Sequence, residues 1–187
     1  MKRINNNVLL LLTSLSLLIV SCQQNREKKE VEKIIREWVG KTILFPDNVD
    51  CFSIGKDSIC PNPMDKTYKV LFYSDSIGCA SCKLQLYKWT ELITESDSVM
   101  QGQLKFLFFF QPKNEKEMNL LLKLESFTHP VYLDIENKFN KLNHFPTNPF
   151  YHCFLLDGDN KVILVGNPCL KLSVWNLYKK VIIGERL

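Results

Sequence analysis

The sequence predicts an α/β fold with a central, mostly parallel sheet, flanking helices and an antiparallel hairpin at one edge. Short apolar runs at 68–74 and 104–110 have the composition of strands buried on both faces. Each run is followed by a segment with apolar residues at helical spacing, and such alternation favours parallel strand pairing. Two later runs, 151–156 and 161–165, flank the turn-forming residues Asp157-Gly158-Asp159-Asn160, which predicts the hairpin.

The other elements follow from the same spacing. Helices are expected at 30–39, 83–95, 114–124, 136–142 and 172–181, and a further short strand at 131–133. Before the first core strand, residues 50–60 are expected to form a hairpin around Gly55-Lys56, because Gly accepts the positive φ of such a turn. In that register Cys51 and Cys60 lie opposite each other, with Cα atoms about 4.5 Å apart. That is within disulfide reach, so the residues form either a disulfide or two small buried apolar side chains.

Length and charge exclude several classes of protein. A chain of 187 residues can bury one good core and is too short for two ordinary domains. Its 45% hydrophobic and 24% charged residues are a normal globular balance. The formal net charge is +4, and Lys2 and Arg3 contribute two of those charges in a segment expected to be removed. The remaining excess, spread over scattered lysines, gives no basis for nucleic-acid binding.

The N-terminus predicts export and lipid attachment. A positive start, Met1-Lys2-Arg3, precedes an almost unbroken apolar run at 8–20. This run has the length of a signal-peptide core, about 7–15 residues, and is shorter than the about 20 residues of a membrane span. The sequence Ile19-Val20-Ser21-Cys22 resembles a lipobox, in which the cysteine is acylated and becomes the first mature residue. The alternative is an ordinary cleaved signal with an incidental Cys22.

These features divide the chain and place it in a compartment. The expected parts are a lipoprotein signal peptide (1–21), a tether (22–29), an N-terminal helix and hairpin extension (30–66) and a main domain (67–187). A lipid anchor at Cys22 would hold the protein on a membrane of the cell envelope, facing the periplasm or the cell surface. Gln23 is not the aspartate associated with inner-membrane retention, which favours the outer membrane. Outside the cytoplasm the other cysteines meet conditions in which disulfides persist.

Cys79 and Cys82 form a CxxC pair between a predicted core strand and a predicted helix. Zinc sites also use CxxC, but they need a second ligand pair of matching spacing, which the sequence lacks; no metal or other cofactor is implied. At a helix N-terminus, unpaired N–H groups and the helix dipole would lower the pKa of the Cys79 thiol from about 8.5 into the range of about 3.5–7.5. Cys82, one turn later, would attack the mixed disulfide formed on Cys79.

At this point the sequence resembles the thioredoxin-like family. The resemblance rests on the strand 68–74, on Ser76-Ile77-Gly78-Cys79-Ala80-Ser81-Cys82-Lys83 and on the late hairpin 154–163, and it covers residues 68–178. The closest type is the membrane-tethered TlpA/ResA-like branch of lipoproteins. The resemblance implies a thioredoxin-like fold in which Cys79 is the nucleophile and Cys82 its partner, exchanging with protein thiols or disulfides of the cell envelope.

The sequence also departs from the family pattern. Gly78 stands where a Trp is usual, and Ala80-Ser81 separate the cysteines where the family often has a proline. Tyr151 occupies the position of the family's cis-proline, with Pro149 two residues earlier. A trans bond is expected at Tyr151, because a non-proline cis bond costs about 3 kcal/mol. Tyr73 stands where many thioredoxins have a buried carboxylate; Asp75 or Glu91 would be the substitutes for proton transfer.

Three functions remain open from the residues. The first is an oxidoreductase acting on exported proteins, and the second is a partner-binding thioredoxin scaffold whose CxxC is a structural disulfide. The third, a peroxiredoxin-type peroxidase, is disfavoured because Arg36 and Arg186, the only arginines after the tether, lie far from the motif in sequence. Cys153 is either a third redox thiol or a filler of the sheet, and Cys169 either pairs with it or stays free. His152 is expected to be a satisfied sheet residue rather than a base.

Overall fold

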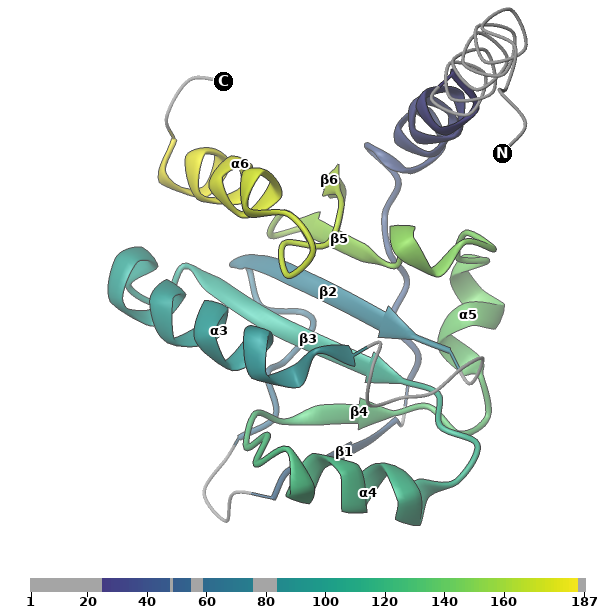
Figure 1. Cartoon of the computed structure of the whole chain (residues 1–187), viewed down its shortest axis with the longest axis vertical. Helices are drawn as coiled ribbons and strands as arrows, with labels where there is room; N and C mark the ends of the chain where they lie inside the picture. The colour runs from purple at the N-terminus through teal and green to yellow at the C-terminus, as the bar shows by residue number, and fades with distance from the viewer. Residues whose placement is uncertain (1–24, 48, 55–58, 76–83, 185–187) are drawn as a thin grey trace, which may run out of the picture. The chain divides into compact units, whose positions relative to one another are not determined.

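The computed structural model describes residues 25–47, 49–54, 59–75 and 84–184 (Figure 1). The chain divides into two compact units, Met1–Glu37 and Trp38–Leu187. Helical structure is present from residue 25, so it already covers positions before the expected start at Glu30, and it ends at Trp38. Lys33 and Glu37, one turn apart on this helix, form an exposed ion pair at 3.8 Å. Within the described ranges, no helix is both long and apolar enough to cross a membrane.

The described part of the second unit contains a mixed sheet in the order β1-β4-β3-β2-β5-β6. The strands are β1 (Asp50–Phe52), β2 (Tyr68–Ser74), β3 (Leu104–Phe110), β4 (Val131–Leu133), β5 (Cys153–Leu156) and β6 (Val162–Val165). The central pairs β2–β3 and β3–β4 are parallel. The pairs β2–β5, β5–β6 and β1–β4 are antiparallel. This mostly parallel core with an antiparallel edge hairpin confirms the predicted fold class.

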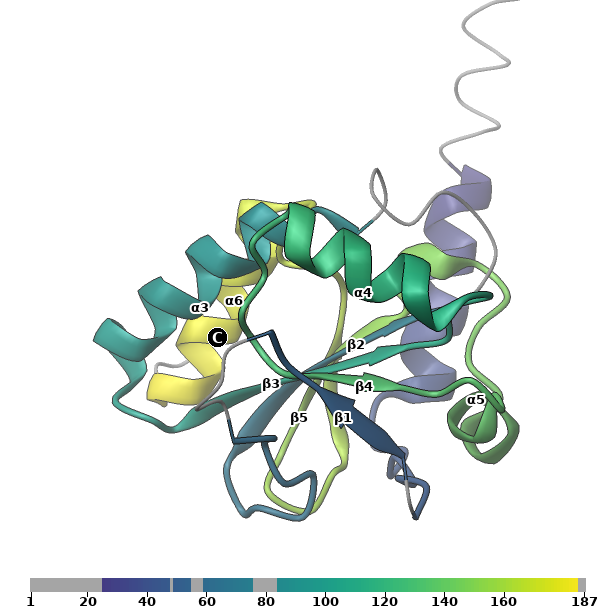
Figure 2. The same ribbon diagram turned by 90° about the horizontal axis from the view of Figure 1, so that it is seen from below.

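Helices cover both faces of the sheet. They are α3 (Leu86–Met100), α4 (Glu115–Leu124), α5 (Lys138–Asn143), the 3₁₀ helix η1 (Pro149–Tyr151) and α6 (Leu172–Ile183). The helices α3, α4 and α6 pack on one face, as Figure 2 shows, and bury a single apolar cluster there. On the opposite face, α5 and the segment 38–45 pack against the alternate side chains of the strands.

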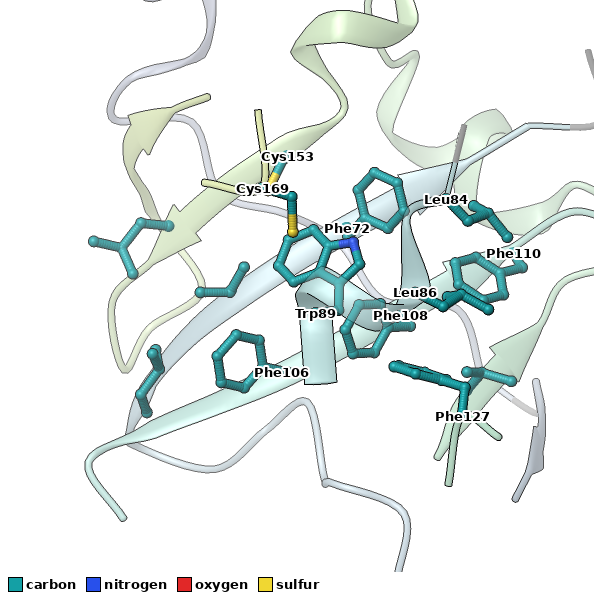
Figure 3. Close-up of a cluster of buried hydrophobic side chains, with 14 of the residues drawn as sticks. Phe72, Leu84, Leu86, Trp89, Phe106, Phe108, Phe110, Phe127, Cys153 and Cys169 are labelled. Carbon is teal, nitrogen blue, oxygen red and sulfur yellow. The ribbon is translucent and has the colours of Figure 1, made fainter. Parts of the chain in front are cut away.

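Aromatic side chains form much of the core on both faces. On the α3 face, the ring of Trp89 lies 5.2 Å from each of Phe72 and Phe108 (Figure 3). On the other face, Tyr73 stacks on Phe145 with ring centroids 4.6 Å apart. Each such pair is worth about 0.5–1.5 kcal/mol beyond the burial of its area. Because β2 and β3 are buried on both faces, their sequences are continuous apolar runs rather than alternating ones.

Two predicted elements differ from the structure. The hairpin expected over 50–60 is wrong: β1 pairs with β4, and residues 59–60 form no strand. β4 pairs with β1 and so takes the place of the second strand of the expected hairpin. The helix expected at 83–95 also differs, because Gln85 adopts a left-handed conformation (φ +47°) and α3 begins after it, at Leu86. α3 then continues to Met100, which is buried together with Ser96.

Candidate functional site

Three connections of the chain meet at one edge of the sheet. β2 ends at Ser74, and its antiparallel neighbour β5 begins at Cys153, which lies opposite Phe72. β6 runs antiparallel to β5, so it ends at the same edge, with Val165 opposite Phe154. The connections β2–α3, α5–β5 and β6–α6 therefore converge there. In α/β sheets, ligands bind beyond the carboxyl ends of the parallel strands, so a binding site is expected at this edge.

A cleft of about 340 Å³ opens at this edge. Among the described residues it is lined by Phe72, Tyr73, Ser74, Asp75, Gln85, Asn148, Pro149, Phe150, Asn167 and Leu170. Phe150 is 68% exposed and Leu170 43% exposed, so the rim is apolar on both sides. The Oε1 atom of Gln85 is buried and has no hydrogen-bond partner. Exposed apolar side chains on the rim suit the docking of a partner protein.

The two cysteines predicted to react lie, in sequence, between two residues that line this cleft. Cys79 and Cys82 lie outside the described residues, as do Gly78, Lys83 and the predicted lipidation site Cys22. The described chain ends at Asp75 on one side of the pair and resumes at Leu84 on the other. Both Asp75 and Gln85 line the cleft. The CxxC sequence therefore belongs to the β2–α3 connection of this edge.

α3 begins at a different residue from the one predicted, which affects the electrostatics at this edge. The helix expected from Lys83 would have begun directly after the cysteines, whereas α3 begins at Leu86. Leu84 is helical too, but the left-handed Gln85 separates it from α3. The first turn of α3 has neither a side-chain cap nor an acidic residue. No acidic side chain of the first turn therefore offsets the positive end of the α3 dipole at this edge.

The wall formed by 148–152 differs from the expected strand. Residues 149–151 form η1, so β5 begins at Cys153 and not at Tyr151. The side chain of Asn148 accepts a hydrogen bond from the backbone N–H of Phe150 at 3.2 Å, which stabilises the turn. No cis peptide bond occurs in the part of the chain that the structure describes, as expected for Tyr151. Pro149 lines the cleft with a trans bond.

Buried polar groups lie behind the cleft. Tyr73 donates a hydrogen bond to Oε1 of Gln111 at 3.1 Å, and burial raises the pKa of its hydroxyl. The Nε2 atom of His152 lies 2.5 Å from the carbonyl oxygen of Pro146, and burial lowers the pKa of this imidazole. The Nδ1 atom of His152 has no partner. Both side chains are therefore neutral at neutral pH. His152 is buried, but it lies just before β5 rather than in a strand and is not fully satisfied, which corrects the prediction in part.

The other predicted residues lie elsewhere. A disulfide joins Cys51 and Cys60, with Cα atoms 6.4 Å apart, at the β1 edge of the sheet. β1 is the outermost strand on one side of the sheet and β6 the outermost strand on the other. This disulfide is therefore not part of the cleft. Glu91 is exposed on α3. No group of three or more His, Cys, Asp or Glu side chains within the described residues could hold a metal ion.

Comparisons with known proteins bear on the fold. No family model matches the sequence, and no curated protein matches it. A solved structure assigned as the thiol:disulfide interchange protein DsbE from Chlorobium tepidum matches with a TM-score of 0.56, over 77% of this chain and 99% of that one, at 14% identity. A PrxQ variant from Xylella fastidiosa matches with a TM-score of 0.53, over 79% and 97% of the two chains, at 12% identity. The fold is thioredoxin-like. At these identities the likeness establishes the fold and leaves the activity to the residues of this chain.

Proposed function

We propose that the chain is an extracytoplasmic thiol–disulfide oxidoreductase that exchanges disulfides with exported proteins through Cys79 and Cys82. The observation that carries the proposal is the position of the CxxC sequence in the β2–α3 connection of a thioredoxin-like fold, between two residues that line a cleft, Asp75 and Gln85. A partner disulfide would be attacked by the thiolate of Cys79. Cys82 would then attack the mixed disulfide, which releases the reduced partner and leaves a Cys79–Cys82 disulfide.

The cleft supports a protein partner rather than a small molecule. Its apolar rim residues Phe150 and Leu170 are exposed and can pack on a partner's side chains. In the proposal the signal peptide (1–21) is removed, Cys22 anchors the protein by lipid to a membrane of the envelope, and the main domain (67–187) performs the exchange.

The test is the reduction potential of the Cys79–Cys82 couple in the full chain, measured against glutathione. A reversible couple between about −120 and −270 mV would agree with the range of known oxidoreductases. The Cys79→Ser and Cys82→Ser variants should each abolish the acceleration of insulin reduction by dithiothreitol. The Cys51→Ala/Cys60→Ala double variant is the matched control and should retain it. In addition, Cys82→Ser should accumulate mixed disulfides on Cys79, and mass spectrometry of these species would identify the partner.

A second function is favoured by the wall at 148–152. η1 has a trans backbone, as expected, where the family usually has a cis-proline loop, so partner docking next to the cysteines would differ. On this alternative the chain is a binding module and Cys79–Cys82 is a static disulfide. A potential below about −300 mV, or a bridge that does not equilibrate with glutathione, would support the binding module and refute the oxidoreductase.

A further inference from the structure

Two free thiols are buried beneath the cleft, outside the proposed reactive pair. Cys153 is 1% exposed and Cys169 is 8% exposed, and neither forms a disulfide. Both belong to the apolar cluster of the α3 face, which also includes Phe72 and Trp89 (Figure 3). Cys153 begins β5, whereas Cys169 lies in the connection from β6 to α6. The two thiols thus come from the two chain segments that form opposite walls of the cleft.

Backbone hydrogen bonds bring these segments together. The N–H of Gly166 donates to the carbonyl oxygen of Cys153 at 2.9 Å, which extends the β5–β6 pairing by one residue. The hydroxyl of Tyr178, on α6, donates to the carbonyl oxygen of Gly166 at 2.7 Å. Gly166 is therefore held between β5 and α6.

The chain then turns and returns Cys169 to the same place. The N–H of Leu170 donates to the carbonyl oxygen of Asn167 at 3.1 Å, which closes a turn over 167–170. The N–H of Cys169 donates to Oδ1 of Asn167 at 2.8 Å. From α3, the ammonium group of Lys88 donates to the carbonyl oxygen of Cys169 at 3.3 Å. The turn is thus held from both sides, with its thiol in the core.

The electrostatics of the thiols agree with this geometry. Burial raises the pKa of both cysteines, and the neighbouring Cys169 raises the pKa of Cys153 further. Figure 3 shows the two side chains beside each other in the apolar cluster, in agreement with this mutual effect. Both are neutral thiols at neutral pH, and a disulfide is neutral as well. Converting one into the other buries no charge, so the apolar surroundings do not oppose the oxidised state.

We propose that Cys153 and Cys169 are a second redox centre, a buried dithiol that a disulfide oxidant converts to a disulfide joining β5 to the 166–171 connection. Two thiols give up two protons and two electrons, and the sulfur–sulfur bond forms between Cys153 and Cys169. The sulfur–sulfur bond of the oxidant breaks, and its two sulfur atoms take up the two protons and the two electrons, giving two thiols. This centre goes beyond the proposed function and does not require Cys79 or Cys82.

The new bond would connect the two walls of the cleft. Asn167 and Leu170 line one wall and flank Cys169 in sequence, while Phe150, on the other wall, lies three residues before Cys153. The oxidation state of the buried pair would therefore set how far the rim can open. For a closed loop of this length, on the order of 15 residues, the chain-entropy relation gives a decrease of about a hundredfold in the equilibrium constant of unfolding.

The experiment uses the full chain treated with excess oxidised glutathione, both in native buffer and in urea below the unfolding transition, which opens buried thiols. Remaining thiols are alkylated in denaturant, and the protein is digested without reduction for mass spectrometry. The expected product is a peptide containing Cys153 linked to one containing Cys169. The Cys51–Cys60 link, found in the same digest, is the internal standard. Urea denaturation of the oxidised protein should then show the hundredfold effect, and Cys169→Ala should not.

Two variants separate this proposal from the proposed function. In Cys79→Ser/Cys82→Ser, the Cys153–Cys169 link should form as in the unmodified chain, although insulin reduction is lost. If the link requires Cys79 and Cys82, an independent second centre is refuted. If Cys153 and Cys169 are instead recovered alkylated, or each bound to glutathione, in both conditions, the centre is refuted whatever the insulin assay shows.

Discussion

The disulfide at the β1 edge should stabilise the fold without contributing to activity. The change is the double substitution Cys51→Ala/Cys60→Ala. Because the two cysteines are 9 positions apart, the chain-entropy relation for the unfolded state gives a loss of about 2.6 kcal/mol at 25 °C. This is a large share of the about 5–15 kcal/mol that stabilises an ordinary domain.

The contacts around the disulfide indicate where this free energy acts. β1 has only three residues and pairs only with β4, where Cys51 lies opposite Tyr132. The hydroxyl of Tyr132 donates to the carbonyl oxygen of Pro61 at 2.6 Å, next to Cys60. The hydroxyl of Ser53 donates to the carbonyl oxygen of Thr128 at 2.9 Å. These bonds keep β1 in place without the disulfide, so the substitution should act mainly through the unfolded chain.

The assay is urea denaturation followed by tryptophan fluorescence, in a Cys79→Ser/Cys82→Ser background. There, adding dithiothreitol to the protein with Cys51 and Cys60 intact should reproduce the effect of the double substitution. In the chain that keeps Cys79 and Cys82, the Cys51→Ala/Cys60→Ala variant should reduce insulin at the unmodified rate. A stability change below about 0.5 kcal/mol would refute the entropic reasoning. Loss of insulin reduction would show that the disulfide belongs to the reaction.

Three further results are expected. Glu95→Ala should lower the free energy of unfolding by about 1–3 kcal/mol, because it removes the acceptor of the buried Trp175 Nε1–H. Glu95→Gln keeps an acceptor and should lower the free energy of unfolding by less than about 1 kcal/mol in the same denaturation. The hydrogen bond from Lys179 lowers the pKa of Glu95 in the folded protein. The stabilisation that Glu95 contributes is therefore complete above the unfolded pKa of 4.5 and is lost as the pH falls through the lower folded pKa. In a pH series below about 5, the free energy of unfolding should fall less in Glu95→Gln than in the unmodified chain. Gly158→Ala should lower the melting temperature, because its Cβ would lie 2.7 Å from the carbonyl oxygen of Lys66, and an unchanged melting temperature would contradict the close approach.

The central strands could be predicted from the sequence with correct bounds. β2, β3 and β4 occupy the predicted ranges 68–74, 104–110 and 131–133. The first two are buried on both faces, so a continuous apolar run distinguishes them from their surroundings. Pro130 directly before β4, and the turn residues between β5 and β6, give equally local signals. The fold class follows from these strands and the helices between them.

Features that depend on contacts distant in sequence could not be predicted. The pairing of β1 with β4 depends on which strand has a free edge, and no local pattern records that. The break at Gln85 has no signal either, because glutamine is a good helix former and only packing explains its left-handed backbone. The meeting of Cys153 and Cys169 depends on a turn at 167–170 that follows a whole hairpin. Their pairing therefore stays open from the sequence alone.

The buried groups behind the cleft limit how the proposed exchange can move protons. A buried carboxylate at the position of Tyr73 could accept a proton from the resolving thiol, but the raised pKa of Tyr73 leaves it a hydrogen-bond donor. His152 has a lowered pKa and stays neutral. Asp134, a buried carboxylate, accepts hydrogen bonds from the N–H groups of Lys138 and Phe139 at 2.8 Å each, which fixes it as the cap of α5. In the proposed reaction these buried groups would therefore not accept the proton of the resolving thiol, which would pass to solvent.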